Sequence, residues 1–150
     1  MQLLTFTLNG IDFGIPVKDV EGIETHRNVV HVPSSPPHVQ GIMNLHGEII
    51  AVYSLASRFG YGNLPVGNIL VVGINGMLVG LEVEQVKSIL EVENKNITPM
   101  PEIMNATQNC FNDVASCQKE LIVLLDVRKL LPQEELQNIG KMVEENITNS

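Results

Sequence analysis

The chain contains an internal repeat, and this feature constrains its fold more than any other. When residues 70–99 are placed over residues 4–33, at a constant offset of 66, one Asn-Gly pair falls on another. Apolar positions match at the same offset. Val17, Val20 and Ile23 of the first copy correspond to Val83, Val86 and Ile89 of the second. A second match follows at an offset of 72, between residues 48–52 and 120–124. The larger offset indicates an insertion in the second copy, around residues 102–119.

Each copy has the pattern of a small β unit. Residues 4–9 alternate between apolar and polar side chains, as in a strand with one buried face. Asn9-Gly10 then predicts a two-residue type I′ hairpin, because both central positions of this turn need a positive φ. A returning strand is expected at 11–17. The spacing of three among the apolar residues from 17 to 23 predicts a short helical turn at the mouth of the unit.

We therefore expect an all-β fold of two small five-stranded antiparallel β-barrel subdomains related by the repeat. Closing a small sheet into a barrel removes unpaired strand edges, which otherwise promote aggregation. The approximate subdomains are residues 4–66 and 69–131, within one domain that spans residues 1–150. Residues 132–150 form a C-terminal helix and tail. Pro132 suits the first turn of this helix, and apolar residues recur on one of its faces at Leu136, Ile139, Val143 and Ile147.

The composition argues against nucleic-acid and membrane partners. The net charge is −8, whereas phosphate binding needs clustered Lys and Arg. The first residues lack the basic segment of a signal peptide, and no stretch is apolar for long enough to span a bilayer. We expect a cytoplasmic protein with no nucleic-acid partner and no direct membrane insertion. Cys110 and Cys117 are expected to be reduced structural thiols.

The sequence gives no sign of catalysis. Four histidines lie close together in the sequence, but no pair has the HxxxH or HxH spacing of metal ligands; they are His26, His31, His38 and His46. No nucleophile elbow, phosphate loop or pair of carboxylates stands out either. We expect no catalytic residue, no metal site and no cofactor. A metal-dependent enzyme is the competing class, and metal analysis of the purified protein would test it.

The segment from residue 33 to residue 55 carries the most specific motif. It reads P-S-S-P-P-H-V-Q-G-I-M-N-L-H-G-E-I-I-A-V-Y-S-L. This run resembles the CheW-like domain, whose pattern is a proline-rich loop, then G-x-x-N-L-R-G, then a strand that leads into D-L. The resemblance covers nearly the whole chain, including the Gly-Ile-Pro-Val of residues 14–17 and the closing strand at 121–127. The order and spacing of these motifs make the resemblance specific.

The resemblance implies a scaffold protein with no cofactor and no chemistry. CheW-like proteins consist of two β-barrel subdomains and couple the cytoplasmic tips of chemoreceptors to a CheA-type histidine kinase, whose regulatory domain has the same fold. The expected partners are therefore a receptor tip and a kinase regulatory domain. The expected location is the receptor array on the inner face of the membrane. An alternative is a variant adaptor, or a decoy, in an accessory chemosensory array.

The resemblance also implies which residues bind partners. By position in the family pattern they are Val20, Gly22, Ile23, Gly41, Asn44, Leu45, His46 and Gly47. Two of them depart from that pattern, since the family usually has Glu at position 22 and Arg at position 46. In the family these side chains resemble a cross-strand ion pair, so the double change predicts a compensated variant. Ser54, where Asp is usual, is a milder departure.

Some of these residues fit either a structural or a partner-binding role. Val20 and Ile23 fit the core of a subdomain as well as they fit an interface. The Asn44–Gly47 run fits a tight hairpin turn that serves only the fold, and it equally fits a turn exposed at a docking surface.

Overall fold

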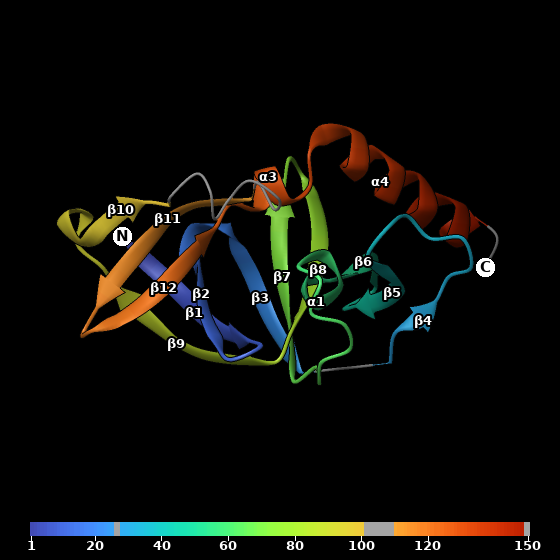
Figure 1. The fold of residues 1–150 in the computed structure, drawn as a ribbon. Helices are drawn as coiled ribbons and strands as arrows, with labels where there is room; N and C mark the ends of the chain where they lie inside the picture. Colours follow the sequence, from blue (N-terminus) through green and yellow to red (C-terminus); the bar gives the residue numbers. More distant parts are fainter. Residues whose placement is uncertain (26–27, 101–109, 149–150) are drawn as a thin grey trace.

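The computed structural model describes residues 1–25, 28–100 and 110–148, and Figure 1 shows how they are arranged. The strands are β1 (Gln2–Leu8), β2 (Ile11–Pro16), β3 (Val20–Thr25), β4 (Val30–His31), β5 (Val39–Leu45), β6 (Glu48–Ser54), β7 (Asn68–Ile74), β8 (Met77–Val83), β9 (Gln85–Glu91), β10 (Ile97–Pro99), β11 (Phe111–Cys117) and β12 (Glu120–Leu125). The helical segments are η1 (Val17–Asp19), α1 (Leu55–Arg58), η2 (Asn94–Asn96), α3 (Val127–Leu130) and α4 (Gln133–Thr148). The predicted insertion at 102–119 lies partly outside the described residues.

The described strands form two six-stranded sheets. The first sheet has the order β10-β11-β12-β2-β1-β9, and the second has the order β3-β7-β8-β6-β5-β4. The two copies of the repeat exchange their opening hairpins, because β1–β2 lies among strands of the second copy and β7–β8 lies among strands of the first (Figure 1). The sheets therefore do not follow the sequence ranges 4–66 and 69–131.

The predicted β fold with a C-terminal helix is confirmed, but the sheets differ from the expected barrels in two details. Each sheet contains one parallel pair, β2 with β12 and β6 with β8. These pairs arise where an exchanged hairpin meets a strand of the other copy. Among the described residues, no recorded pairing joins the two outer strands of either sheet. Each subdomain is thus a small sheet of six strands with one parallel pair, where five antiparallel strands were expected, and barrel closure is not detected among the described residues.

The two Asn-Gly turns match the type I′ prediction. Asn9 and Gly10 have φ values of 53° and 76°, and Asn75 and Gly76 have φ values of 49° and 84°. The strands on either side of each turn pair directly across it. Positive φ at both central positions gives the turn the twist of the flanking strands.

The spacing of three between residues 17 and 23 has two causes. The predicted helical turn exists as η1, but it ends at Asp19. Beyond it, the pairing of β3 with β7 shifts between Val20 and Gly22. This β-bulge adds one residue to the strand and reverses the alternation of its side chains. The helical prediction is therefore wrong beyond Asp19, and the bulge explains why Val20 and Ile23 share a side.

The largest hydrophobic cluster lies between the two sheets, and it includes residues of both, such as Phe6, Phe13, Leu70 and Leu81. Each sheet also encloses a smaller hydrophobic cluster of its own. A β-carbon at Gly14 would lie 3.0 Å from Ile122 Cγ2, and one at Gly80 would lie 2.8 Å from Ile69 Cγ2. These glycines are equivalent in the repeat, and their missing side chains let each small cluster close.

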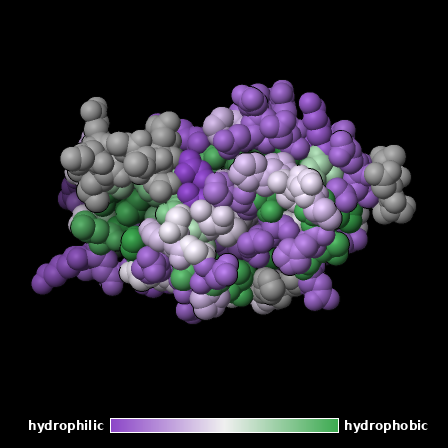
Figure 2. Space-filling view, turned by 45° about the vertical axis from the view of Figure 1, so that its right-hand side comes forward, coloured by the Kyte–Doolittle hydropathy of each residue, from purple (hydrophilic) through white to green (hydrophobic). Residues whose placement is uncertain are grey.

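Helix α4 packs its predicted apolar face onto the second sheet. Leu136, Ile139 and Met142 are buried, whereas Ile147 near the end of the helix is 51% exposed. Hydrophilic residues cover the outer face of this helix, at the top of the view in Figure 2. Within the described residues, no helix has the length and apolar character that crossing a membrane requires.

Candidate partner-binding site

The edge strands β3 and β9 present equivalent apolar residues. Val20 on β3 and Val86 on β9 are partly buried against the cluster between the sheets. Ile23 and Ile89 lie three residues further along and are 44% and 57% exposed. Each is paired across the ladder with a residue of that same cluster. We call these four residues the apolar ledge.

A matching pair of bulges positions the ledge. In β9 the register with β1 shifts so that Lys87 is the extra residue, 66 positions after the bulged Glu21 of β3. Each bulge places a partly buried Val and an exposed Ile on the same side of its strand. The apolar ledge therefore has the same construction on both subdomains.

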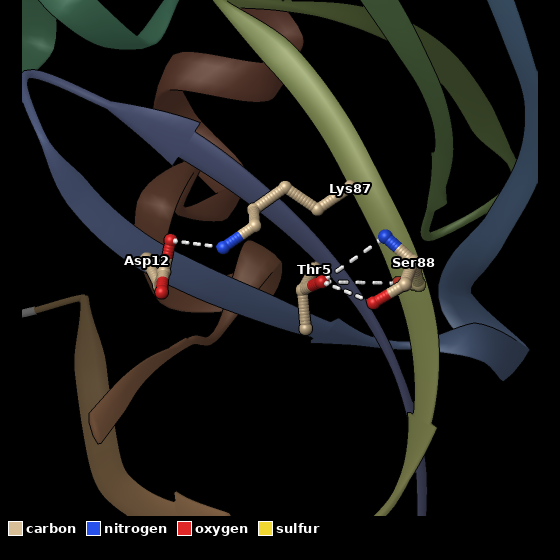
Figure 3. A network of polar contacts seen from close by, with 4 residues as sticks. All are labelled: Thr5, Asp12, Lys87 and Ser88. Carbon is tan, nitrogen blue, oxygen red and sulfur yellow. Dashed lines mark hydrogen bonds and ion pairs between the residues drawn. The ribbon is translucent and has the colours of Figure 1, made fainter. Parts of the chain in front are cut away.

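Polar contacts fix the bulge in β9, as Figure 3 shows. The buried Thr5 hydroxyl lies 3.1 Å from the carbonyl oxygen of Ser88 and accepts a hydrogen bond from the Ser88 N–H at 3.2 Å. The bulged Lys87 extends its Nζ to within 3.2 Å of Asp12 Oδ1 on β2. These contacts connect three neighbouring strands, so the segment that carries Ile89 is held in place.

The structure confirms that residues 44–47 form a hairpin turn. His46 and Gly47 have φ values of 50° and 93°, and they connect β5 directly to β6. The Asn44 side chain accepts a hydrogen bond from the Gly47 N–H at 2.8 Å. Leu45 packs against the small cluster of the second sheet. The turn is thus a built structural element, and its tip is exposed.

The turn reaches across to the opposite edge of the second sheet. His46 Nε2 lies 3.7 Å from Glu24 Oε1 on β3, and the His46 side chain is 78% exposed whereas Glu24 is 16% exposed. Position 46 therefore has an acidic neighbour, but this neighbour stands at position 24 rather than 22. Gly22 and Glu24 lie on the same side of β3, because they are two residues apart on one strand beyond the bulge. The acid nearest to His46 in this contact is therefore Glu24, on the side of β3 that Gly22 shares.

Gly22 and Gly41 have different structural roles. A β-carbon at Gly22 would meet no atom within 4 Å. A β-carbon at Gly41 would collide with the backbone carbonyl of Val30 on β4, the strand that pairs with β5 at this point. Gly41 is required for the close approach of two strands, whereas Gly22 leaves open space on the surface.

Two residues of the apolar ledge were not predicted from the sequence. Val86 and Ile89 are the equivalents of Val20 and Ile23 at the offset of 66. The repeat contained this signal, but the family pattern alone led to residues of the first copy. The structure therefore extends the candidate site to both subdomains.

Three side chains near α1 have pKa values shifted toward their neutral forms. Burial lowers the pKa of His38, and the Arg58 guanidinium lowers it further. Burial also raises the pKa of Tyr53 and raises that of the Cys110 thiol to about 11. A neutral thiol is a poor nucleophile. In the described ranges, no three His, Cys, Asp or Glu residues are grouped so that they could hold a metal ion.

Comparison with known proteins places this architecture in a family. A sequence model described as the CheW-like domain matches residues 2–135. The chain belongs to the CheW-like family. All eight residues that the CheW-like pattern indicated lie within the matched range, as do Val86 and Ile89.

Individual CheW-like relatives agree over most of their length. The chain is 24% identical to chemotaxis protein CheW of Klebsiella aerogenes, with 93% of this chain and 89% of the relative covered. It is 28% identical to a probable chemotaxis protein CheW of Rhizobium etli, with 89% of each covered. The crystal structure of the scaffolding protein TtCheW from Thermoanaerobacter tengcongensis superposes with a TM-score of 0.81 at 25% identity, again with 89% of each chain covered.

Proposed function

We propose that this chain is a non-catalytic adaptor of chemotaxis signal transduction, which couples chemoreceptors to a CheA-type histidine kinase. The observation that carries the proposal is the match to the CheW-like domain over residues 2–135. The names of the relatives, a chemotaxis protein and a scaffolding protein, support the same role.

The apolar ledge is the proposed docking site for the receptor tip. A receptor tip is a helical hairpin, and helices bind proteins by laying apolar side chains against an apolar surface. Ile23 and Ile89 provide this surface from rigid strands, one on each subdomain. Binding on pre-formed strands avoids much of the entropy cost of ordering loops.

The exposed turn at residues 44–47 is the proposed docking site for the kinase regulatory domain. Both central residues of this turn have positive φ values, and the hydrogen bond from the Gly47 N–H to the Asn44 side chain stabilises it. The His46 ring at the tip of the turn lies 3.7 Å from the Glu24 carboxylate on β3. An exposed turn of fixed geometry suits contact with the rim of another small β subdomain, where the match of polar groups decides which partner binds.

The two docking sites can be separated by mutation. We expect Ile23→Arg and Ile89→Arg to weaken binding of a receptor tip fragment at least tenfold, because each places a charge where apolar contact is needed. The matched control is Leu121→Arg, since Leu121 is an apolar residue with 67% exposure that lies outside the apolar ledge. Isothermal titration with receptor and kinase fragments is the measurement.

The outcomes of this experiment are distinct. Weakened receptor binding by both ledge variants, with kinase binding unchanged, supports the assignment. Equal weakening by Leu121→Arg would contradict the receptor site. If the intact wild-type chain binds neither the receptor tip nor the kinase fragment at high micromolar concentration, the adaptor role itself is wrong.

A further inference from the structure

The two Asn-Gly turns are equivalent in the repeat but differ in their surroundings. The Asn75 side chain donates a hydrogen bond from Nδ2 to Gln133 Oε1 at 3.3 Å, which ties it to the first residue of α4. At Asn9, the main-chain N–H donates to Glu84 Oε1 at 2.6 Å. In the part of the chain that the structure describes, the Asn9 carboxamide itself makes no hydrogen bond.

An Asn followed by Gly can deamidate without an enzyme, because Gly lacks a side chain that would hinder ring closure. The Gly main-chain nitrogen loses its proton to water and attacks Cγ of the Asn. A new N–C bond forms, the bond from Cγ to Nδ2 breaks, and ammonia leaves. Water then opens the resulting succinimide at one of its two carbonyls. The product is Asp, or isoaspartate when the main-chain carbonyl is the one attacked.

Ring closure requires the Asn to leave the left-handed conformation of the turn. The rate in the folded protein therefore follows how often the turn opens and how freely the carboxamide rotates. The tether to Gln133 restrains the carboxamide of Asn75. The exposed Asn9 turn has no such tether from its side chain.

We propose that Asn9-Gly10 is a site of spontaneous deamidation in the folded protein and that Asn75-Gly76 is protected by its contact with α4. The modification has a structural consequence at position 9. An Asp there adds a negative charge beside the Glu84 carboxylate, which already accepts from the main chain of residue 9. An isoaspartate adds a carbon to the main chain, so the two-residue turn between β1 and β2 can no longer keep its geometry.

The effect extends to the apolar ledge, because β1 lies between β2 and β9 in the first sheet. Thr5 on β1 and Asp12 on β2 hold the bulge of β9 (Figure 3). Loss of register in the β1–β2 hairpin would displace both contacts. The chemistry at Asn9 does not depend on the proposed adaptor function, and it can be tested without any partner.

The test compares the two sites within one protein. The folded protein is incubated in mildly alkaline buffer, a parallel sample is incubated in urea, and peptide mass spectrometry follows the mass gain at residues 9 and 75. We expect deamidation at Asn9 to be several-fold faster than at Asn75 in the folded protein. In urea the two rates should be similar, because both Asn-Gly pairs follow a bulky aliphatic residue.

Two variants sharpen the result. Gln133→Ala should raise the rate at Asn75 and leave the rate at Asn9 unchanged. Asn9→Asp should lower the melting temperature, and adding Glu84→Gln should recover it, since Gln keeps the acceptor and removes the charge. Equal rates at both sites in the folded protein, or no deamidation at Asn9, would overturn the proposal.

Discussion

His46 Nε2 lies 3.7 Å from Glu24 Oε1, and this contact joins the β5–β6 turn to the edge strand β3. Strand β3 is one edge of the second sheet, and β5 lies next to β4 at the other edge. The contact therefore brings the β5–β6 turn close to β3, although these strands are not neighbours in the order of the second sheet. It also gives position 46 an acidic neighbour on the side of β3 that Gly22 shares.

This geometry predicts how the pair couples. We expect the double-mutant cycle of Glu24→Gln and His46→Gln to show a weak coupling, about 0–1 kcal/mol, because the His46 side chain is 78% exposed and water screens the contact. Gly22→Glu with His46→Arg should couple by a similar amount, since open space at Gly22 can accept a side chain. Thermal melts of the single and double variants measure both. A coupling well above about 1 kcal/mol would contradict the expectation of a weak, solvent-screened contact.

Gly22 and Gly41 of the candidate site should differ in their response to the same substitution. Gly41→Ala should destabilise the protein by about 1–3 kcal/mol or more, because the new β-carbon collides with the Val30 carbonyl. Gly22→Ala is its matched control and should change the free energy of unfolding by less than about 1 kcal/mol. Urea unfolding measures both. A Gly41→Ala variant as stable as the wild type would show that β4 moves aside easily.

The halves of the chain should not fold separately. Residues 1–66 contain β1 and β2 but lack β9 and β12, which flank this hairpin in the first sheet. Residues 67–150 likewise contain β7 and β8 without β3 and β6. Each half alone would leave strand edges and the cluster between the sheets exposed. We expect circular dichroism to show no cooperative melt for either fragment; a fragment that melts like the intact chain would contradict this.

The sequence was most informative where local chemistry decides the structure. Asn-Gly predicted both type I′ turns, and the heptad-like spacing from Leu136 to Val143 predicted the buried face of α4. The exchange of hairpins between sheets was not predictable in this way, because either arrangement buries the same alternating residues. The bulge at Val20–Gly22 also escaped detection, since a spacing of three is equally typical of a helix.

The candidate site was predicted only in part for a related reason. The family pattern located Val20, Ile23 and the turn at 44–47, but it assigned the acidic partner of His46 to position 22. A strand presents every second residue on one side, so positions 22 and 24 of β3 both face His46, and the structure places the acid at position 24. Such a shift is visible only when the distance between the two side chains is known.

His38 should make the protein less stable as the pH falls. Its pKa is lowered in the folded state, first by burial and then by Arg58, from the ordinary value of 6.5. The unfolded chain therefore binds the proton more strongly, and the free energy of unfolding should decrease as the pH falls below that value. His38→Asn should reduce this pH dependence. Asn tolerates the positive φ of 67° at this position, so the turn is kept. Chemical denaturation at several pH values is the measurement, and identical slopes for both proteins would refute the role of His38.

The turn between β11 and β12 offers the last test, because it is the equivalent of the His46–Gly47 turn with a different residue pair. Gln118 and Lys119 have φ values of 48° and 70°, so a lysine occupies the position that Gly47 fills in the first copy. A left-handed conformation costs a residue with a β-carbon about 1–2 kcal/mol, while glycine loses about 0.5–1 kcal/mol in chain entropy on folding. Lys119→Gly should therefore stabilise the protein slightly, by about 0.5–1 kcal/mol, and Gly47→Lys should destabilise it by a similar amount. Urea unfolding of the two variants decides the matter, and a destabilised Lys119→Gly would mean that the lysine side chain makes contacts worth more than the strain it carries.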